Sequence, residues 1–378
     1  MKTASVISAV AVIVAIVVAV FTSLIWYALL KWNLLHSVVN EPALIHDQLV
    51  YHRQLVDKIN KKSTWKAKFN PDAAIQVTYG LDVDETVNNI HNEWTNSLTR
   101  FILADTNTKN SVELFGRPSV SQIPRFFDAR RKWPYCRSLH RPNQEQGACG
   151  SCWAVVGAAV ISDRICIHSK GEQQVEISAE EIVNCNQYGG SCSGGELWFP
   201  FQHWVANGVI TGGEYGSNQG CQPYSHSADC GRPCAKWQFA NAKQCQTQCV
   251  ANYTKRYHED KQYGQSLYYL NVMDTNNSMV ELMQWDIMER GPISAGFVAP
   301  IDLLHYDSGV YEHVAGGIVY SHAVRLIGWG ETSKGVPYWL VANSFGSSWG
   351  DNGFFKMLRG SNHLNIETES FVAMPKFT

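Results

Sequence analysis

The stretch QEQGACGSCWAVVG, residues 144–157, holds two cysteines separated by two residues, then a tryptophan and an apolar run. From Cys152 to Ile167 the sequence is apolar on nearly every side of a helical projection, which predicts a helix buried all round rather than a surface helix. Gly171 is expected to end this helix. The two cysteines stand at the start of a central element, so their chemistry decides what kind of protein this is.

A Cys-x-x-Cys pair can hold a metal, act as a redox pair, or combine one disulfide cysteine with one reactive thiol. A structural zinc site usually needs a second such pair, and the cysteine pairs farther along the chain are spaced differently. A thioredoxin-like redox site needs a βαβ pattern that this sequence lacks. The third interpretation is favoured. It places Cys149 in a disulfide and makes Cys152 a thiolate whose pKa the helix N-terminus lowers.

The composition limits the function classes. The chain has 378 residues, a formal net charge of −2 and eleven cysteines, none of them before Cys136. The small net charge gives no electrostatic footprint for nucleic acid. The cysteine density is typical of a disulfide framework formed in an oxidising compartment, and the odd count leaves at least one thiol over. Sequons at Asn252 and Asn276 are consistent with glycosylation in the secretory pathway. No cofactor and no metal are expected.

The chain divides into three parts. No charged residue occurs between Thr3 and Leu30, a run long enough to cross a bilayer, so residues 1–35 are expected to be a signal-anchor or a long signal peptide. Residues 36–122 carry a helical pattern from Asn40 to Lys62 and then polar sequence without cysteine. That composition suits a linker, a weak domain or a pro-segment. Residues 123–378 are aromatic and cysteine-rich and form the main domain.

Two β-branched and aromatic runs, residues 316–330 and 336–345, predict a pair of strands joined by a turn. If Gly330 lies opposite Gly335, that register places His322 opposite Asn343 on the same face. A thiolate nucleophile needs an imidazole to exchange its proton, and the imidazole needs an orienting group. His322 and Asn343 are therefore the expected partners of Cys152. Helices early and strands late in this domain predict an α+β fold.

The pattern C-G-[SA]-C-[WY], present as CGSCW, is typical of papain-like cysteine peptidases. Other stretches resemble the cathepsin B group of that family: IPRFFDARRKWPYC, ISDRICIHSKG, SAEEIVNC, YWLVANSF, WGDNGFFKMLRG and, in the propeptide, LVDKINKKSTWKAKFN. The resemblance covers roughly residues 48–378. It implies a propeptide at 36–122 and a disulfide-rich, two-lobed papain-like peptidase at 123–378. The central helix from Cys152 would lie in the helical lobe, and His322 and Asn343 in a β-barrel-like lobe.

The resemblance also implies a reaction. Cys152 would cleave peptide bonds through a thioester, His322 would act as general acid and base, and the Gln146 amide would donate to the oxyanion. The protein would be made as a zymogen, act on polypeptides and be inhibited by cystatin-like proteins. It would work in lysosomes, endosomes or outside the cell, with a precursor that the N-terminal segment can anchor in the membrane. The implied disulfides are Cys136–Cys166, Cys149–Cys192, Cys185–Cys245, Cys221–Cys249 and Cys230–Cys234.

Substrate-binding positions follow from the same resemblance and include departures from it. Phe345 replaces the tryptophan that covers the His–Asn hydrogen bond, so weaker shielding is expected, and Ser321 replaces a glycine before the histidine. Glu369 matches an acid that accepts arginine at the S2 pocket, and Glu196 replaces an aromatic wall. The full set of expected substrate-binding residues is Gly194, Gly195, Glu196, Ser321, Phe345, Trp349 and Glu369.

The segment from Cys221 to Cys234 corresponds to the occluding loop of the cathepsin B group, but only three residues separate its last two cysteines. The histidine pair that binds a substrate carboxylate in that group is absent, which predicts mainly endopeptidase activity. His226 and Arg232 are candidates to replace the pair, although both are expected to be exposed polar loop residues. The alternative to an enzyme is a catalytically inactive, cathepsin B-like protein that binds matrix or membrane partners.

Overall fold

The computed structural model describes residues 46–73, 109–116, 122–270, 278–368 and 370–377. Residues His52–Thr378 form one compact unit, and all of the described strands lie within it. Within the described ranges, no helix combines the length and the apolar character needed to span a membrane. Residues 1–35, to which the signal-anchor prediction applies, lie outside those ranges.

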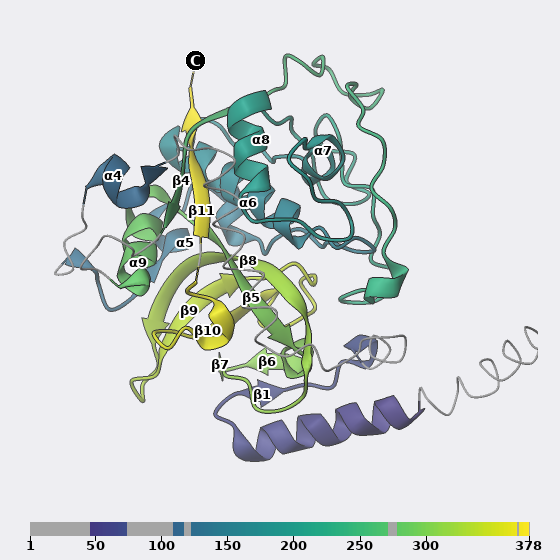
Figure 1. The fold of residues 1–378 in the computed structure, drawn as a ribbon, viewed down its shortest axis with the longest axis vertical. Helices are drawn as coiled ribbons and strands as arrows, with labels where there is room; N and C mark the ends of the chain where they lie inside the picture. The colour runs from purple at the N-terminus through teal and green to yellow at the C-terminus, as the bar shows by residue number, and fades with distance from the viewer. Residues whose placement is uncertain (1–45, 74–108, 117–121, 271–277, 369, 378) are drawn as a thin grey trace, which may run out of the picture. The chain divides into compact units, whose positions relative to one another are not determined.

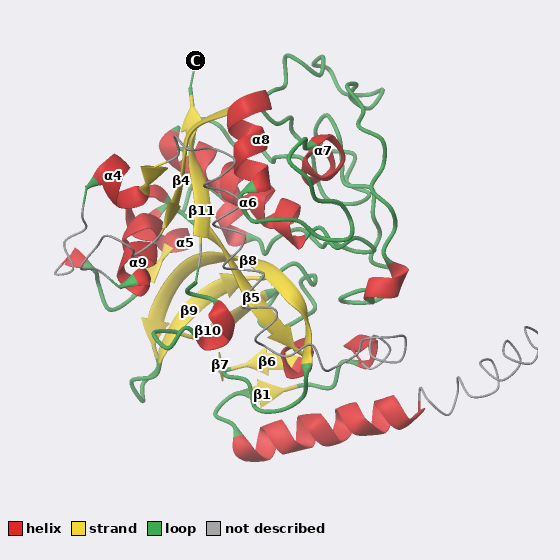
Figure 2. Ribbon diagram, in the orientation of Figure 1, coloured by secondary structure: helices red, strands yellow, loops and turns green. Residues whose placement is uncertain are grey.

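Helices dominate one half of this unit and strands the other (Figures 1 and 2). The helical half contains α6 (Cys152–His168), α7 (Ala179–Cys185) and α8 (Phe199–Asn207). Helix α6 is buried at fourteen of its seventeen residues, as its apolar sequence predicts. After its last turn the Gly171 N–H donates to the Cys166 carbonyl oxygen at 2.8 Å with a positive φ of 88°, a conformation that favours glycine.

The other half is a six-stranded sheet in which β8 pairs with β3, β5 and β9, and β9 leads through β10 to β7. A three-stranded sheet orders β11, β4 and β2, and a two-stranded sheet joins β1 to β6. This mixture of helix and sheet confirms the predicted α+β class. The strands are β1 (Lys66–Ala67), β2 (Lys109–Asn110), β3 (Phe127–Asp128), β4 (Tyr263–Leu270), β5 (Ile293–Pro300), β6 (Tyr306–Ser308), β7 (Val310–Tyr311), β8 (Ile318–Glu331), β9 (Pro337–Ala342), β10 (Phe354–Leu358) and β11 (Ser370–Lys376).

The remaining elements connect these sheets and helices. A helix over residues 46–62 is the longest of them. Helix α9 begins with a capping box in which Ser278 and Glu281 each accept from the other's backbone N–H. This arrangement satisfies two N–H groups that the first helical turn leaves without partners. The elements are α4 (Ser111–Phe115), α5 (Ala129–Lys132), α9 (Met279–Arg290) and the 3-10 turns η2 (Arg137–His140), η3 (Lys236–Gln238), η4 (Ile301–His305) and η5 (His363–Asn365).

The predicted register between β8 and β9 is wrong. Gly330 pairs with Tyr338 rather than with Gly335, because the turn between the strands is longer than assumed. An irregularity between Leu326 and Gly328 then shifts the pairing by one residue, as a β-bulge does. The β8–β9 pairing stops at Arg325, and His322 pairs on the other side of β8 with Phe297 of β5. Asn343 follows the end of β9 and reaches the imidazole as a diagonal neighbour, a spacing that keeps both side chains on one face.

Residues that precede the main domain pack against its strands. Strand β1 pairs antiparallel with β6, and Figure 1 shows the two side by side. Before β1, the Trp65 side chain is fully buried, with its ring 6.0 Å from Tyr306 and 5.1 Å from Tyr311. Its indole N–H donates to the Glu312 carbonyl at 2.8 Å. A Cβ at Gly309 would lie 2.7 Å from Trp65, so a glycine is required for this close approach.

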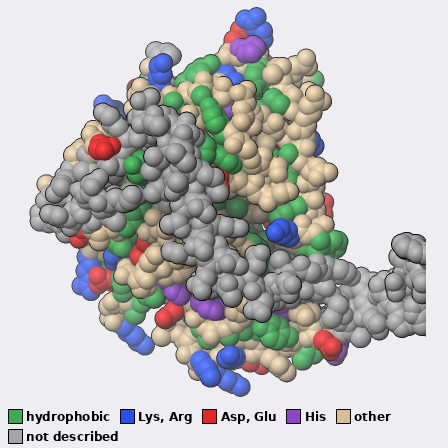
Figure 3. All heavy atoms as spheres, in the orientation of Figure 1, with side chains coloured by type: hydrophobic (Ala, Val, Ile, Leu, Met, Phe, Trp, Pro, Cys, Tyr) green, Lys and Arg blue, Asp and Glu red, His purple; other side chains and the backbone are tan. Residues whose placement is uncertain are grey.

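Charges are scattered over the surface. On the face shown in Figure 3, the acidic and basic side chains of the described residues lie interspersed rather than gathered in one basic patch. This distribution accords with the formal net charge of −2. Some charged side chains are buried instead, and one such pair joins a helix to a strand.

A buried ion pair joins α6 to β8. The Arg325 guanidinium donates to the Asp163 carboxylate at 2.7 Å and to the Arg141 carbonyl oxygen at 2.6 Å, and both charged side chains are almost completely buried. Burial raises the pKa of Asp163, and the nearby Arg325 charge opposes that rise. Asp163 lies about three helical turns after Cys152 on one face of α6. The pair therefore fixes the helix that carries Cys152 against the strand that carries His322.

We expect Arg325→Met to lower the free energy of unfolding by about 3–5 kcal/mol, because it leaves the Asp163 carboxylate buried without its cation. The double variant Asp163→Leu/Arg325→Met buries no charge and should be more stable than Arg325→Met. Urea unfolding at neutral pH measures both values. As a control, Arg130→Met removes a partly exposed pair with Asp128 and should cost no more than about 1 kcal/mol. A double variant less stable than Arg325→Met would contradict this account.

Candidate active site

All eleven cysteines lie within the described residues, and Cys152 is the one that remains free. Since Cys149 is bound to Cys192, the Cys-x-x-Cys pair is neither a redox pair nor a zinc clip. A disulfide framework therefore leaves one thiol for chemistry. The five disulfides are the pairs that the family resemblance implies, namely Cys136–Cys166, Cys149–Cys192, Cys185–Cys245, Cys221–Cys249 and Cys230–Cys234.

The environment of Cys152 opposes its ionisation. Burial raises the pKa of the Cys152 thiol, and the backbone N–H groups of Ala323, Trp153 and Cys152 itself oppose this rise. The expected net lowering by the helix N-terminus is thus wrong, because removal from water outweighs these N–H groups. The Ala323 contact also locates the sulfur. Ala323 follows His322 on β8, so Cys152 lies beside the strand that carries the imidazole.

The His322 ring is held by Asn343. Its Nε2 lies 2.8 Å from the Asn343 Oδ1, which also accepts from the Ser344 N–H at 2.8 Å. Since Oδ1 can only accept, Nε2 carries the proton in the neutral ring. His322 Nδ1 is buried and has no hydrogen-bond partner among the described residues. Burial lowers the pKa of His322 to about 4, although the Asn343 hydrogen bond opposes this. The ring is therefore a neutral base with one open nitrogen.

Gln146 lies close to the start of α6. Its side-chain Oε1 accepts from the Ser344 hydroxyl at 2.7 Å, and its Nε2 donates to the Cys149 carbonyl oxygen at 3.3 Å. An amide nitrogen carries two hydrogens, so one remains for another acceptor. Ser344 therefore connects the Asn343 side chain to the Gln146 side chain, and it fixes the two amides relative to each other.

Tyr224 completes this connection and was not foreseen in the sequence. The Tyr224 hydroxyl donates to the Gln146 carbonyl oxygen at 2.8 Å and lies 2.5 Å from the Ser151 hydroxyl, which must then donate to it. Ser151 precedes Cys152 as the N-cap of α6. Nothing in the spacing around Tyr224 signals this contact, because the residue lies in a loop whose path only the fold defines.

Phe345 covers the histidine. Its ring stacks on the His322 ring at 4.8 Å with an interplanar angle of 25°, and it is fully buried. Trp349 meets Phe345 edge-on at 5.4 Å and donates its indole N–H to the Leu304 carbonyl oxygen. The phenyl ring thus occupies the covering position expected of it, although it is smaller than an indole and has no N–H.

The remaining predicted binding and glycosylation residues differ in burial and in their contacts. A Cβ at Gly195 would lie 2.6 Å from the Trp153 ring, so the backbone passes directly over that indole. The preceding Gly194 exchanges backbone hydrogen bonds with Ser191 at a φ of 126°. Ser321 is exposed on β8 beside His322. Glu196 is half-buried, and the glycosylation candidate Asn252 is exposed. Glu369 and Asn276 fall outside the described residues.

Neither candidate replacement for the missing histidine pair is a free loop cation. The prediction that His226 is exposed is wrong, because only 6% of its surface is accessible. Its ring packs edge-on against Tyr224, and its Nε2 lies 3.6 Å from the Cys192 sulfur. Burial lowers the pKa of His226. The nearby sulfurs of Cys149 and Cys192 belong to one disulfide, so this group does not form a thiolate metal site.

Arg232 is exposed, as predicted, but it is paired. Its guanidinium binds the carboxylate of Glu145 at 2.7 Å. Glu145 directly precedes Gln146 in the chain. Burial raises the pKa of Glu145 and the Arg232 charge opposes the rise. The Arg232 backbone N–H also donates to Asp72, and its carbonyl oxygen accepts from Asn70. The short loop is therefore connected both to the Gln146 segment and to residues 70–72.

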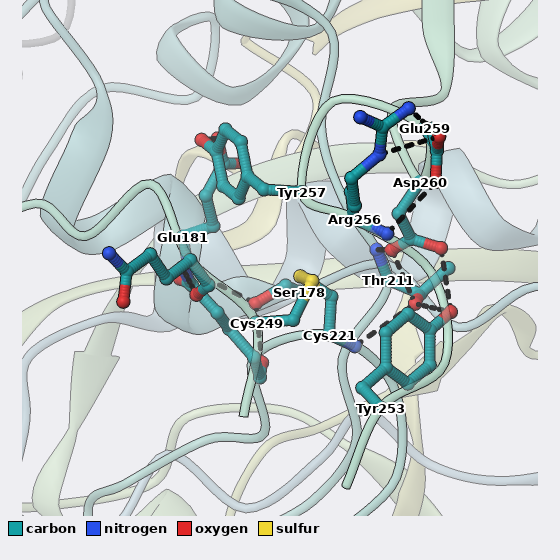
Figure 4. The surroundings of a disulfide bond; sticks show 12 residues. Ser178, Glu181, Thr211, Cys221, Cys249, Tyr253, Arg256, Tyr257, Glu259 and Asp260 are labelled. Carbon is teal, nitrogen blue, oxygen red and sulfur yellow. Dashed lines mark hydrogen bonds and ion pairs between the residues drawn. A yellow bond between two sulfur atoms is a disulfide. The ribbon is translucent and has the colours of Figure 1, made fainter. Parts of the chain in front are cut away.

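A disulfide and side-chain hydrogen bonds cross-link the base of the same loop (Figure 4). The Cys221–Cys249 disulfide lies beside Thr211, whose carbonyl oxygen accepts from the Cys221 N–H at 2.9 Å. The buried Asp260 carboxylate accepts from the Thr211 hydroxyl at 2.7 Å and from the Tyr253 hydroxyl at 2.6 Å. These bonds fix where the cysteine-bounded segment starts, and so the position of Tyr224 three residues later.

Comparisons with known proteins agree with this geometry. The family model of the papain family cysteine protease matches residues 123–374. A cathepsin B-like cysteine proteinase of Schistosoma japonicum is 40% identical over 272 residues, covering 69% of this chain and 77% of that protein. Cathepsin B-like cysteine proteinase 3 of Caenorhabditis elegans is 43% identical over 260 residues, covering 68% of this chain and 67% of that protein. The solved structure of procathepsin B S9 from Trypanosoma congolense is 29% identical, has a TM-score of 0.63, and covers 86% of this chain and 98% of that one.

We expect Phe345→Ala to lower kcat/KM for a peptide substrate about tenfold, because water then competes for the His322–Asn343 hydrogen bond. Phe345→Trp should restore the wild-type value or exceed it. Steady-state kinetics of the processed protein measures both. Phe355→Ala is the matched control, since Phe355 touches Trp349 but not His322 in the described ring contacts. An equal loss of kcat/KM in Phe355→Ala would assign the effect to general destabilisation.

Proposed function

Because this chain belongs to the papain family of cysteine proteases and is a cathepsin B-like zymogen, we propose that Cys152, His322, Asn343 and Gln146 are its catalytic residues. The proposal rests mainly on one observation. The Asn343 hydrogen bond occupies Nε2 of His322 and leaves the buried Nδ1 open, while the backbone N–H of the residue after His322 favours the thiolate of the one free cysteine.

The mechanism uses this arrangement in two halves. His322 Nδ1 takes the thiol proton, and the Cys152 sulfur attacks the substrate carbonyl carbon. The remaining Gln146 amide hydrogen and the Cys152 backbone N–H donate to the oxygen, which becomes negative. The C–N bond breaks as Nδ1 returns the proton to the leaving amine. Water then attacks the thioester with His322 as base, which releases the carboxylate product and the Cys152 thiol.

We further propose that residues 36–122 are an inhibitory propeptide and that the peptidase begins near Ile123. Contacts made by residues 52–73 support this, since β1 pairs with β6 and the buried Trp65 indole donates to Glu312. The family model also begins its match at residue 123. Residues 1–35 would carry the chain into the secretory pathway as a signal-anchor or signal peptide. The five disulfides and the exposed Asn252 sequon are consistent with that route.

The proposed substrates are polypeptides, with the mature enzyme in lysosomes, endosomes or the extracellular space and cystatin-like proteins as inhibitors. Glu369 would favour arginine at P2 through charge-assisted hydrogen bonds. These finer assignments rest on the family resemblance alone. The alternative, an inactive binding protein of matrix or membrane, gains no support from the site, because none of the four proposed catalytic side chains is missing.

An epoxide that alkylates active-site thiols should add one equivalent to the acid-processed protein, at Cys152. We expect Cys152→Ala to abolish both alkylation and peptide cleavage. His322→Ala should lower kcat/KM by about 10²–10⁴-fold, since it removes the general acid and base. Mass spectrometry and a fluorogenic peptide assay give the two readouts. Processed wild-type protein that is neither alkylated nor active would support the inactive alternative.

We also propose that the enzyme is mainly an endopeptidase. Glu145 already neutralises the Arg232 guanidinium, and His226 is buried, so neither side chain is placed as a free cation for a substrate's C-terminal carboxylate. Carboxylate capture depends on such charge-assisted hydrogen bonds. The short loop, with three residues between Cys230 and Cys234, also offers little bulk to exclude a longer chain.

This proposal predicts similar release of the terminal dipeptide from one peptide with a free and with an amidated C-terminus, within about threefold, since a tenfold preference would require about 1.4 kcal/mol of carboxylate binding. Liquid chromatography of timed digests measures the ratio. A preference above tenfold for the free acid would overturn the proposal. Its loss in Arg232→Ala but not in Arg137→Ala, an arginine of η2, would then identify Arg232 as the carboxylate ligand.

A further inference from the structure

Two histidines from distant parts of the chain form a buried hydrogen bond. His52 lies in the helix over residues 46–62, and His305 ends η4 in the peptidase domain. The His52 Nδ1 lies 2.7 Å from the His305 Nε2, and their exposed fractions are 0% and 1%. This bond joins the proposed propeptide to the proposed enzyme through two groups that titrate near neutral pH when they are free in water.

The surrounding hydrogen bonds define which nitrogens carry protons. The Asn70 backbone N–H donates to the His305 Nδ1 at 3.0 Å, so this nitrogen is unprotonated. The proton of the neutral His305 ring is then on Nε2 and is donated to the His52 Nδ1. Both accepting nitrogens lose their hydrogen bond if they are protonated, because a second N–H would then face the donor. The docked arrangement requires both rings to be neutral.

The described groups around His305 give little compensation for a positive charge on that ring. The Phe69 ring stacks on His305 at 6.1 Å with an interplanar angle of 12°, and the Arg53 guanidinium lies over the same phenyl ring. The Asp302 carboxylate and the Lys68 backbone favour a charged His305. Asp302 is already bound to the Tyr311 hydroxyl, His313 and the backbone N–H groups of residues 314 and 315, however.

Burial is therefore the main cause that shifts the pKa values of the two histidines. It lowers the pKa of His52 to about 4 and that of His305 to about 3, the latter also through repulsion from a charged His52. An imidazole in water titrates near pH 6.5. The docked state thus binds fewer protons than the released state at mildly acidic pH. By linkage, the stabilisation of docking is complete above about pH 6.5 and is lost as the pH falls toward 4.

We propose that the His52–His305 pair is a proton-sensitive latch that holds the propeptide on the enzyme at neutral pH and releases it in acid. The inference rests on the proposed function, since it assigns residues 52–73 to the inhibitory segment. Asn70 carries the effect toward the site. Its backbone binds His305, and its side chain donates to the carbonyl oxygens of Arg232 and Leu304. Protonation at His305 therefore loosens the residue that holds the short loop.

The test uses the full-length chain with Cys152→Ala, so that no cleavage can occur. Hydrogen exchange reports the latch through two backbone amides, Asn70, which donates to the His305 ring, and Lys68, which donates to the His305 carbonyl oxygen at 2.8 Å. Protection factors are taken relative to intrinsic exchange at each pH. A single histidine whose pKa is 6.5 in the released state lowers the equilibrium constant of docking by up to about thirtyfold between pH 7 and pH 5. We expect protection to fall more than thirtyfold for the pair.

His52→Asn retains an acceptor, since the Asn Oδ1 can occupy the position of Nδ1, but it cannot titrate. In this variant the protection of the two amides should fall by at most about thirtyfold between pH 7 and pH 5. In His52→Asn/His305→Asn the protection should stay constant within about threefold. His168→Gln is the matched control. His168 is a partly buried histidine of α6 whose pKa burial also lowers, and it bonds the Arg290 carbonyl oxygen. Its replacement should leave the full pH-dependent fall unchanged.

Constant wild-type protection between pH 7 and pH 5 would overturn the latch, and this result needs no variant at either histidine. A fall that is the same in the double variant, or one that His168→Gln abolishes equally, would also overturn it. Catalysis is tested separately, because exchange is measured without the nucleophile. A latch that fails in a chain whose processed form cleaves peptides leaves the proposed function intact, and the converse result leaves the latch intact.

Discussion

The ion pair between Asp163 of α6 and Arg325 of β8 connects the two halves of the molecule through the helix that carries Cys152 and the strand that carries His322. Arg325 lies three residues after His322 on the same strand, and Asp163 lies on the helix that begins at Cys152. Burying two charges carries a desolvation penalty, which their mutual attraction offsets only while both partners are present. The Arg325 guanidinium also donates to backbone carbonyl oxygens. The relative position of thiol and imidazole therefore depends on a contact far from either of them.

A second constraint is that the environment of Cys152 disfavours charge. Burial raises the thiol pKa and lowers that of His322, so each group by itself prefers its neutral form. Only transfer of the proton from one to the other creates two opposite charges that stabilise each other. Asn343, Gln146 and Phe345 are arranged around that transfer. They orient the ring, supply an amide hydrogen and limit the access of water to the His–Asn hydrogen bond.

Much of this could be predicted from the sequence because the signals are local. The apolar run after Cys152 predicts α6, and the motif around it indicates the proposed nucleophile. The register of β8 and β9 was predicted wrongly, because neither the turn length nor the irregularity near Gly328 has a sequence signal. Even so, His322 and Asn343 meet, since a shift of two residues keeps the same face of a strand.

Contacts between distant segments were not predictable in the same way. Tyr224, which positions Gln146 and Ser151, lies in a loop fixed by the Cys221–Cys249 disulfide. His52 and His305 are 253 residues apart, and each by itself is an ordinary histidine in its segment. Such pairs depend on how whole elements pack. Periodicity and short motifs describe one element at a time and do not contain that information.

The most direct test of the central claim is the ionisation of Cys152 in the processed protein, measured by thiolate absorbance near 240 nm against a Cys152→Ser reference. The account predicts that wild-type protein contains a thiolate well below the ordinary thiol pKa of about 8.5, because His322 accepts the proton. In His322→Ala the thiolate should appear only at or above that value, since burial then acts alone. An equal thiolate titration in both proteins would contradict the claim that Cys152 and His322 act as one pair.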